Sequence, residues 1–518
     1  MDPQTSEIAR AYDEVPYASK PFPQSQPPRL AALARLFGLT PPDISTAHVL
    51  ELGCAAGGNL IPLAAAYPNA EFLGLDLSSV QIAAGQARIA RMGLSNIRLV
   101  HQSIADITRG LGTFDYIICH GVYSWVPAGV RDAILRVCNE NLSAGGVAYV
   151  SYNLFPGWRL RGVLRDAMLF HADSASDPAE RLARGRDFLQ QLGTITNAGT
   201  PYGQMLRHEA KMMSAAEDYY VSHEYLETNN APCYVSDFLK RLDVFNLAFL
   251  TESDLHLTIA ENFGAETGSL LRSLSGNRLD RMEQYIDFLT GRTFRQSLLV
   301  RREQAPRIGR VLSPEKISGL HLSTGLSPDP QIEGERFIFK DRAERTLTTT
   351  SPAVRDAVSR LARMYPLTAT PEQLIEVDGG ERSEQDKADI MRSLFNMVMA
   401  GIAEISSVPC VASMTPAERP LAGPLARADA RDGQSWTTNV RHETVPLGLV
   451  ARAVLPMLDG TNSQEDIAAR MQSMVADGTL TFHKDGEKLL ESKLIEAAID
   501  DHISNALSGF RRAALLVA

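Results

Sequence analysis

Short apolar runs alternate with amphipathic segments between residues 48 and 157. The runs VLEL, FLGLDL and YIICH are nearly continuous in apolar residues, which is typical of strands covered on both faces. The intervening segments, such as SVQIAAGQARIARMGL, repeat apolar residues at helical spacing. Strands and helices that alternate in this way predict a doubly wound α/β fold built on a parallel sheet.

Helix-like segments dominate residues 158–305, with one or two strand insertions such as LAFLTES. Loop-like, proline-containing sequence near residues 305–345 indicates a domain boundary. Beyond it, two stretches each read as a helix, a turn and a second helix that begins at a Ser/Thr N-cap. With ERFIFKD and TLTFHKD as strands, they predict winged-helix-like units, and two ordinary helical hairpins are the alternative.

The chain has 518 residues, of which 44% are hydrophobic and 22% charged. At roughly 150 residues per domain this is enough for about three domains, and the composition excludes disordered, collagen-like and coiled-coil classes. We divide the chain into an N-terminal segment, an α/β core, a helical middle domain and a C-terminal α+β domain. Their predicted bounds are residues 1–47, 48–157, 158–305 and 306–518.

Charge and cysteine usage narrow the classes further. Lys and Arg number 51 against 61 Asp and Glu, a net charge of −10 that argues against constitutive binding to nucleic acid or anionic membranes. Five cysteines without a CxxC pair suggest neither a disulfide framework nor a zinc site. The polar, acidic start does not resemble a secretory signal, and no apolar stretch is long enough to span a bilayer. We expect a cytoplasmic protein.

The segment VLELGCAAGGNL carries the most specific chemical signal. A strand that ends at Glu51 is followed by a glycine-rich turn and a helix, which is typical of a nucleotide-binding loop. Gly53, Ala55 and Gly58 match the dinucleotide fingerprint G-x-G-x-x-G with one substitution. Glu51, Gly53 and Gly57 match acidic-x-G-x-x-x-G, the pattern of class I S-adenosylmethionine-dependent methyltransferases.

Charge helps to separate these two ligands. A dinucleotide brings a pyrophosphate to the helix N-terminus, whereas S-adenosylmethionine carries a sulfonium and an amino acid group and no phosphate. The Glu51 carboxylate suits the ammonium of such a cation, and Gly53 and Gly57 let the backbone approach it closely. Asp76, at the end of the second strand, is placed to accept from both ribose hydroxyls in either class.

The third and fourth predicted strands discriminate between the two classes. LVHQSIADI places Asp106 where its carboxylate would accept from the adenine amine, and FDYIICHGVYSWVP places His120 to Tyr123 after the fourth strand. This succession resembles class I methyltransferases in order and spacing. A redox Rossmann domain and a degenerate scaffold are the alternatives.

Further motifs extend this resemblance beyond the cofactor core. AYDEVPYASKPF, SYNLFPGW and YYVSHEYLETNNAPCYVSDF resemble bacterial methyltransferases that carry a methyltransferase regulatory domain. Within that group the chain resembles the rickettsial-type outer-membrane-protein lysine methyltransferases. Specific motifs carry this resemblance over about the first 300 residues, and beyond residue 310 it rests mainly on architecture. The resemblance implies a Rossmann-like core, a regulatory middle domain, a C-terminal domain for a substrate or partner, and methyl transfer to lysine ε-amines of a protein.

The resemblance also implies a cofactor site drawn from several loops. Its residues would be Glu51, Gly53, Ala55, Gly57, Asn59, Asp76, Leu77, Ser103, Asp106, Ile107, His120 and Tyr123. Tyr12, Tyr17 and Phe22, from the N-terminal segment, would fold over the cofactor as a lid.

Aromatic residues near the predicted cofactor site suit the sulfonium of the donor, and they also suit an acceptor lysine that has lost its proton and its bound water. For each aromatic residue, packing in the core is the alternative. SYNLFPGW follows the fifth predicted strand and places Asn153 where its carbonyl would orient a neutral amine. Because methyl transfer proceeds largely by proximity and alignment, no strong general base is required. The candidate catalytic residues are Tyr123, Tyr152 and Asn153.

The motif HEYLETNNAPCY contains ionisable residues outside the cofactor core. His223 and Glu227 stand four residues apart, but the second His of a zinc motif is missing. We therefore expect no metal, and we interpret the motif as a solvated helix face followed by a turn.

Three functions remain open at this point. The first is a protein-lysine methyltransferase, with a protein substrate as its partner. The second is a small-molecule (biosynthetic) methyltransferase, since the same core serves many acceptors. The third is a regulatory protein that binds the cofactor without turnover, and the acidic charge argues against nucleic acid as its partner.

Overall fold

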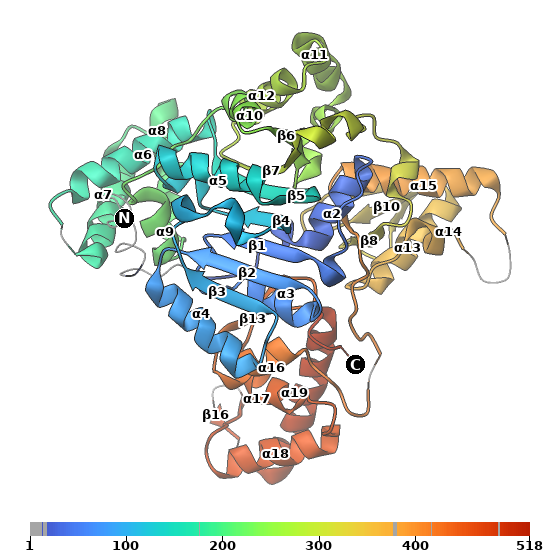
Figure 1. Ribbon diagram of the computed structural model, residues 1–518. Coiled ribbons are helices and arrows are strands. Elements are labelled where there is room, and N and C mark those ends of the chain that lie inside the picture. Colours follow the sequence, from blue (N-terminus) through green and yellow to red (C-terminus); the bar gives the residue numbers. More distant parts are fainter. Residues whose placement is uncertain are drawn as a thin grey trace.

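The computed structural model describes residues 13, 18–175, 177–376, 381–415, 417–484, 487–489 and 491–517. Seven strands form one central sheet in the order β3-β2-β1-β4-β5-β7-β6. A helical bundle, a mixed α/β unit and a C-terminal unit lie on three different sides of this sheet (Figure 1).

The first five strands are parallel and confirm the predicted doubly wound fold. β1 lies between β2 and β4, so the strand order reverses at this point and leaves a crevice at the carboxyl edge. The strands are β1 (His48–Leu52), β2 (Glu71–Asp76), β3 (Ile97–His101), β4 (Phe114–Cys119) and β5 (Leu142–Asn153), and their helices are α3 (Leu60–Ala66), α4 (Ser79–Met92) and α5 (Ala128–Glu140).

The part predicted as a helical middle domain completes the sheet with two antiparallel strands, β6 (Leu247–Glu252) and β7 (Phe294–Arg301). The insertion LAFLTES is confirmed as β6, whereas β7 was not predicted. Two of the buried positions of β7 are polar, Arg295 and Ser297, so its sequence lacks the long apolar run of a central strand.

The helical character predicted for the middle region is confirmed. Its helices are α6 (Gly157–Ala172), α7 (Pro178–Ile195), α8 (Pro201–Ser214), α9 (Asp218–Tyr225), α10 (Val235–Val244), α11 (Ala265–Ser275) and α12 (Leu279–Thr290). Of these, α11 is a further helix that was not predicted. The side chains of Asp177 and Thr200 cap α7 and α8 by accepting backbone N–H bonds. Buried apolar side chains such as Leu164 and Leu206 hold α6 to α9 together as a bundle.

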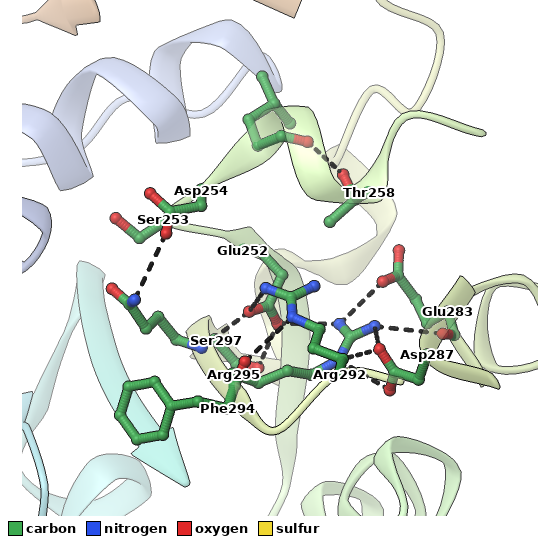
Figure 2. A network of polar contacts seen from close by, with 12 residues as sticks. Glu252, Ser253, Asp254, Thr258, Glu283, Asp287, Arg292, Phe294, Arg295 and Ser297 are labelled. Atoms are coloured by element: carbon green, nitrogen blue, oxygen red, sulfur yellow. Dashed lines mark hydrogen bonds and ion pairs between the residues drawn. The ribbon is translucent and has the colours of Figure 1, made fainter. Parts of the chain in front are cut away.

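An ion-pair network fastens α12 to β6 and β7 (Figure 2). Arg295 lies 3.1 Å from Glu252 and 2.8 Å from each of Glu283 and Asp287. Arg292 reaches the second oxygen of Glu252 at 3.4 Å. Because buried charges are tolerated only with partners, these side chains depend on one another.

The C-terminal part consists of two units, and the first packs on α2 (Pro27–Leu36). Thr370 and Gln373 form a capping box at the start of its second helix, as the Ser/Thr N-cap pattern predicted. ERFIFKD is confirmed as a strand. The elements are β8 (His321–Thr324), β9 (Gln331–Glu333), β10 (Arg336–Lys340), β11 (Thr346–Thr349), α13 (Pro352–Met364), α14 (Pro371–Ile375), α15 (Glu384–Met399) and β12 (Ala403–Ser406).

The second C-terminal unit has an apolar core of its own and docks on α4. Arg88 and Arg91 on α4 pair with Asp429 and Asp432 at 2.6 and 3.2 Å. The elements are α16 (Pro424–Arg431), β13 (Trp436–Thr438), β14 (Thr444–Pro446), α17 (Leu449–Val454), α18 (Gln464–Ala476), β15 (His483–Lys484), β16 (Glu487–Lys488) and α19 (Ser492–Arg512).

Short 3-10 turns connect many of these elements. They are η1 (Pro23–Ser25), η2 (Ile44–Thr46), η3 (Ile104–Asp106), η4 (Arg109–Leu111), η5 (Tyr123–Trp125), η6 (Leu255–Thr258), η7 (Ala260–Phe263), η8 (Arg302–Arg307), η9 (Pro314–Ile317) and η10 (Leu455–Met457). Within the described ranges, no helix has the length and apolar character needed to cross a membrane.

Candidate functional site

A cavity of about 160 Å³ opens at the carboxyl edge of the sheet, where the strand order reverses between β1 and β4. The loop after β1, the end of β2 and the residues after β3 and β4 line it. The N-terminal segment and α9 contribute further residues. Ligands of open α/β sheets bind at this position.

Close packing explains the glycines of the loop after β1. Gly53 has a φ of 76°, and a Cβ at this position would lie 2.4 Å from the side chain of Val122. A Cβ on Gly58 would lie 1.9 Å from the backbone oxygen of Ser19. Larger residues would therefore push the loop away from the cavity and from the N-terminal segment.

Glu51 lines the cavity and is almost completely buried. Its Oε1 accepts a 2.8 Å hydrogen bond from Nδ2 of Asn59, whereas its Oε2 has no hydrogen-bond partner among the described residues. Burial raises the pKa of Glu51 to about 8, and the Asn59 bond opposes this shift. A buried carboxyl with one oxygen unpaired is a place where a cationic group gains a partner.

Asp76 is the last residue of β2 and forms a hydrogen bond with the glycine-rich loop after β1. Its two carboxylate oxygens accept 2.8 Å bonds from the backbone N–H groups of Ala55 and Ser78. Burial raises its pKa, and these backbone bonds oppose the shift. Each carboxylate oxygen keeps a second lone pair, so Asp76 is still able to accept from hydroxyl groups of a ligand.

His120 follows β4 and lies between two aromatic rings. Its ring centroid is 3.8 Å from that of Phe22, and its Nδ1 lies 2.8 Å from the hydroxyl of Tyr149. Burial lowers the pKa of His120 to about 3, so the imidazole is neutral near pH 7. The cavity thus gains an aromatic wall that carries no positive charge.

The N-terminal segment covers part of the cavity. Asp13 accepts a 2.5 Å bond from the hydroxyl of Ser78, the hydroxyl of Ser19 accepts a 2.7 Å bond from Gly58, and the backbone N–H of Phe22 donates to Asn59 at 2.9 Å. The lid function of the segment stays a prediction. Tyr12 and Tyr17 lie outside the described residues, so their part in the lid stays a prediction.

The structure brings many of the predicted cofactor residues together and leaves others outside. The predicted residues that line the cavity are Glu51, Gly53, Ala55, Asn59, Asp76, Leu77, Ser103 and His120. Gly57, Asp106 and Ile107 are not among the lining residues. Gly57 packs against Leu99, Ile107 is in the apolar core, and Asp106 is exposed on η3. The binding role of each residue stays a prediction.

The three candidate catalytic residues do not line the cavity either. Tyr152 is buried, stacks on Phe238 and shares a 3.0 Å hydrogen bond with Ser297. Tyr123 packs edge-on against the same two rings. Asn153 is buried, and its Nδ2 donates to Asn230 at 3.0 Å. The contacts of these three side chains are with neighbours in the protein, and their catalytic role stays a prediction.

Sequence reasoning missed two cavity residues on α9, His223 and Glu224. Because His223 is only 5% exposed and pairs with Glu227 at 2.7 Å, the prediction of a solvated helix face is wrong for this motif. One signal in the sequence could have indicated these cavity residues. HEYLE has several ionisable residues close together, although its helix also buries apolar side chains such as Val221.

The second C-terminal unit reaches the site through His442, which lies between β13 and β14. Its Nε2 is 2.7 Å from Oδ1 of Asn59, and both side chains are buried. Burial lowers the pKa of His442 to about 3, so the ring is neutral. Because Oδ1 of Asn59 only accepts, Nε2 of His442 carries the proton. The contacts then run from His442 through Asn59 to Glu51.

Three family models match separate parts of the chain. A methyltransferase domain matches residues 50–148, a predicted methyltransferase regulatory domain matches residues 217–301, and a domain described as "PKMT, C-terminal winged helix domain" matches residues 418–515. The last match confirms the winged-helix prediction for the second C-terminal unit.

Full-length comparisons lead in the same direction. An uncharacterized protein of Rickettsia prowazekii is 33% identical over 522 residues, which cover 98% of this chain and 93% of that protein. The solved structure of PKMT2 from Rickettsia typhi is 30% identical and has a TM-score of 0.87, with 97% of this chain and 100% of that chain covered. The chain belongs to the rickettsial PKMT family of methyltransferases. PKMT2 has also been solved in complex with AdoHcy, and that structure is 29% identical to this chain over 97% of its length, again with a TM-score of 0.87.

As a PKMT family member, the protein is an S-adenosylmethionine-dependent methyltransferase. The cavity fits this cofactor. The unpaired Oε2 of Glu51 suits an ammonium, and Asp76 suits ribose hydroxyls. In the described lining, Lys20 is the only Lys or Arg side chain, so a pyrophosphate would lack a cluster of cationic partners.

Proposed function

We propose that the protein transfers methyl groups from S-adenosylmethionine to the ε-amines of lysine residues in a protein substrate. The observation that carries this proposal is the mixed lining of the cavity. The polar cofactor loops continue into an apolar lining around η5, formed by Trp125, Val126, Pro127 and Val130. Such a surface suits the four methylenes of a lysine, which pack on apolar side chains while the nitrogen end stays polar. The likeness to PKMT2 over the whole chain supports the same class of acceptor.

The chain's own residues would position the reactants. Glu51 and Asn59 hold the amino acid end of the donor, and Asp76 holds the ribose. When bound, S-adenosylmethionine supplies a methyl group activated by its sulfonium. The neutral ring of His120 and the side chain of Phe22 cover this edge without adding a repelling charge. Alignment of a neutral amine in a site from which water is excluded provides most of the acceleration for such a transfer.

Labelling with a radioactive methyl donor tests the proposal. The protein is incubated with labelled S-adenosylmethionine and with extracts of cell envelope and of cytosol, and the labelled protein is hydrolysed to amino acids. We expect discrete labelled protein bands that release ε-N-methyllysines. Asp76→Ala is the matched variant in which labelling should disappear.

Other distributions of the label would decide against this acceptor. Label confined to small metabolites would favour the small-molecule methyltransferase. Calorimetric binding of AdoHcy without any transfer would favour the regulatory protein. Label on protein side chains other than lysine would retain the protein substrate and reject the lysine acceptor.

A further inference from the structure

The middle domain contributes its own wall to the cavity through α9. His223 and Glu224 line the cavity next to residues of the cofactor loops. Nδ1 of His223 lies 2.7 Å from Oε1 of Glu227, and both side chains are largely buried. Lys20, which lines the same cavity, has its Nζ 3.5 Å from the hydroxyl of Tyr219 on α9. Glu224 is the carboxylate of α9 that lines the cavity.

Three carboxylates line the described part of the cavity, and two of them belong to the cofactor loops. Glu51 accepts from Asn59, and Asp76 accepts from two backbone N–H groups. Glu224 comes from a different domain, and the cavity that it lines also has the apolar surface of Trp125 and its neighbours. A long side chain with a cation at its tip needs this pairing of an apolar surface with a carboxylate.

The electrostatic surroundings of Glu224 suit exchange of a proton. Burial raises its pKa to about 7, and Arg161 on α6 and His223 on α9 oppose this shift. Tyr220 and Tyr225 interact electrostatically with both Glu224 and Arg161, and Glu209 interacts with both tyrosines. Lys20 is a further charged group that lines the same cavity. A carboxyl group that titrates near neutral pH is charged often enough to attract an ammonium and basic enough to take a proton from it.

We propose that Glu224 binds the ε-ammonium of the acceptor lysine and accepts one of its protons; this inference rests on the proposed function. The ammonium transfers a proton to the Glu224 carboxylate. The freed lone pair on nitrogen forms the bond to the methyl carbon while the methyl–sulfur bond breaks, and the electron pair of that bond stays on sulfur. The product leaves as a methylammonium, and Glu224 returns its proton to solvent.

Glu224→Gln removes the charge and preserves the shape of the side chain. Rates are measured from pH 6 to 10 with the protein fraction that the wild-type enzyme labels, and AdoHcy affinity is measured by calorimetry. We expect kcat/KM for the acceptor to fall by about 100-fold, a usual contribution of a positioned acid or base, with AdoHcy affinity unchanged. The wild-type increase in rate through about pH 7 should be absent in this variant. Glu224→Asp should restore part of both features. Glu217→Gln, which changes an exposed glutamate directly before α9, should behave as wild type.

A small amine provides a readout that does not depend on activity. Crystals of the AdoHcy complex are soaked with n-butylamine, which has the four-carbon chain and the ammonium of a lysine side chain, and in parallel with n-butanol. We expect the amine nitrogen within hydrogen-bond distance of Glu224 and no ordered butanol there. Placement of the nitrogen on Glu51 or Asp76, or no bound amine, would overturn the inference.

The outcomes separate this inference from the proposed function. If the wild-type enzyme methylates no lysine, the proposed function fails whatever Glu224 does. If the wild-type enzyme methylates lysine and Glu224→Gln does so within threefold of its rate, only the role of Glu224 fails. If Glu224→Gln also loses AdoHcy binding, Glu224→Asp and the amine soak decide between a local role and a folding defect.

Discussion

At the scale of the single residue, burial has changed the charge state of several cavity side chains. Glu51 holds its proton up to about pH 8, whereas His120 and His442 lose theirs at about pH 3. All three are therefore largely neutral near pH 7 in the ligand-free protein. A cationic ligand would supply the partner that an ionised Glu51 lacks, so ligand binding and ionisation of this carboxyl are linked.

Glu51→Gln should change AdoHcy affinity and thermal stability in different ways. We expect AdoHcy to bind about tenfold to 100-fold more weakly, because a hydrogen bond to a charged group contributes roughly 1.5–3 kcal/mol. The folded pKa of Glu51 lies above its unfolded value, so ionisation erodes wild-type stability as pH rises from about 4.5 to about 8. Without ligand, the variant should melt like wild type below this window and at a higher temperature above it, as measured by scanning calorimetry.

Exposed Glu71 is the matched control for this prediction. Glu71→Gln should leave both AdoHcy affinity and the pH dependence of melting unchanged. Equal melting temperatures of wild type and Glu51→Gln at pH 9 would contradict the raised pKa of Glu51.

Asp76→Ala should weaken AdoHcy binding by about 100-fold, because the ribose loses its carboxylate and the Ala55 N–H loses its acceptor. Isothermal titration gives the affinity directly. Asp106→Ala is an informative companion, since the structure leaves Asp106 exposed and outside the cavity lining. We expect wild-type affinity for it, and a clear loss would reinstate the adenine contact that the sequence predicted.

At the scale of the element, the middle domain is attached to the sheet by charge as well as by apolar packing. Glu252 on β6, Arg295 on β7 and Asp287 on α12 are buried together (Figure 2). Burial raises the pKa of Asp287 to about 6, although Arg295 pulls it down. Ser297 donates a 2.6 Å bond to Glu252 and shares another with Tyr152, so the network extends to β5.

Arg295→Met should therefore destabilise the protein strongly. Loss of the guanidinium leaves three buried carboxyl groups without their main partner, and removal of one member of such a group costs about 3–5 kcal/mol. Urea unfolding followed by tryptophan fluorescence measures this loss. Arg278→Met is the control, because Arg278 is exposed and pairs locally with Asp280; its midpoint should stay close to that of wild type.

The same elements show which parts of the fold could be predicted from sequence. The parallel strands carry apolar runs that follow from burial on both faces, so β1, β2 and β4 were predictable. β7 was not, because Arg295 and Ser297 occupy buried positions and are satisfied by partners on β6 and α12. Burial of a charge depends on partners distant in sequence, and a local pattern does not reveal them.

The site was predictable where its chemistry is local in sequence. The loop from Glu51 to Asn59 and the strand end at Asp76 have fixed spacings, and the structure places both at the cavity. Glu224 and His442 join the cavity region only through packing between domains. Neither has a spacing relation to the loop, so sequence reasoning missed the first as a cavity residue and had no signal for the second.

At the scale of the whole molecule, separate parts of the chain meet at the cavity. The N-terminal segment contributes Phe22, the middle domain contributes Glu224, and the C-terminal unit contacts Asn59 through His442. Pairs such as Arg88 with Asp429 hold the C-terminal unit in place. The C-terminal unit is thus part of the support of the cofactor site in addition to any contact with a substrate.

His442→Ala should weaken AdoHcy binding by about tenfold, because Asn59 loses one buried hydrogen bond and orients Glu51 less well. The melting temperature should fall slightly. His502→Ala removes an exposed ring that stacks on Phe482 in the same unit and should leave AdoHcy affinity unchanged. Wild-type affinity in His442→Ala would show that the contact is only a domain interface.

The bond between His442 and Asn59 joins positions 383 residues apart. During translation, the glycine-rich loop leaves the ribosome long before this histidine has been synthesised. A nascent chain therefore has the donor-binding loop before His442 is present to support it, and termination before residue 442 would leave the loop without this hydrogen bond. Full donor affinity would then depend on completion of the polypeptide.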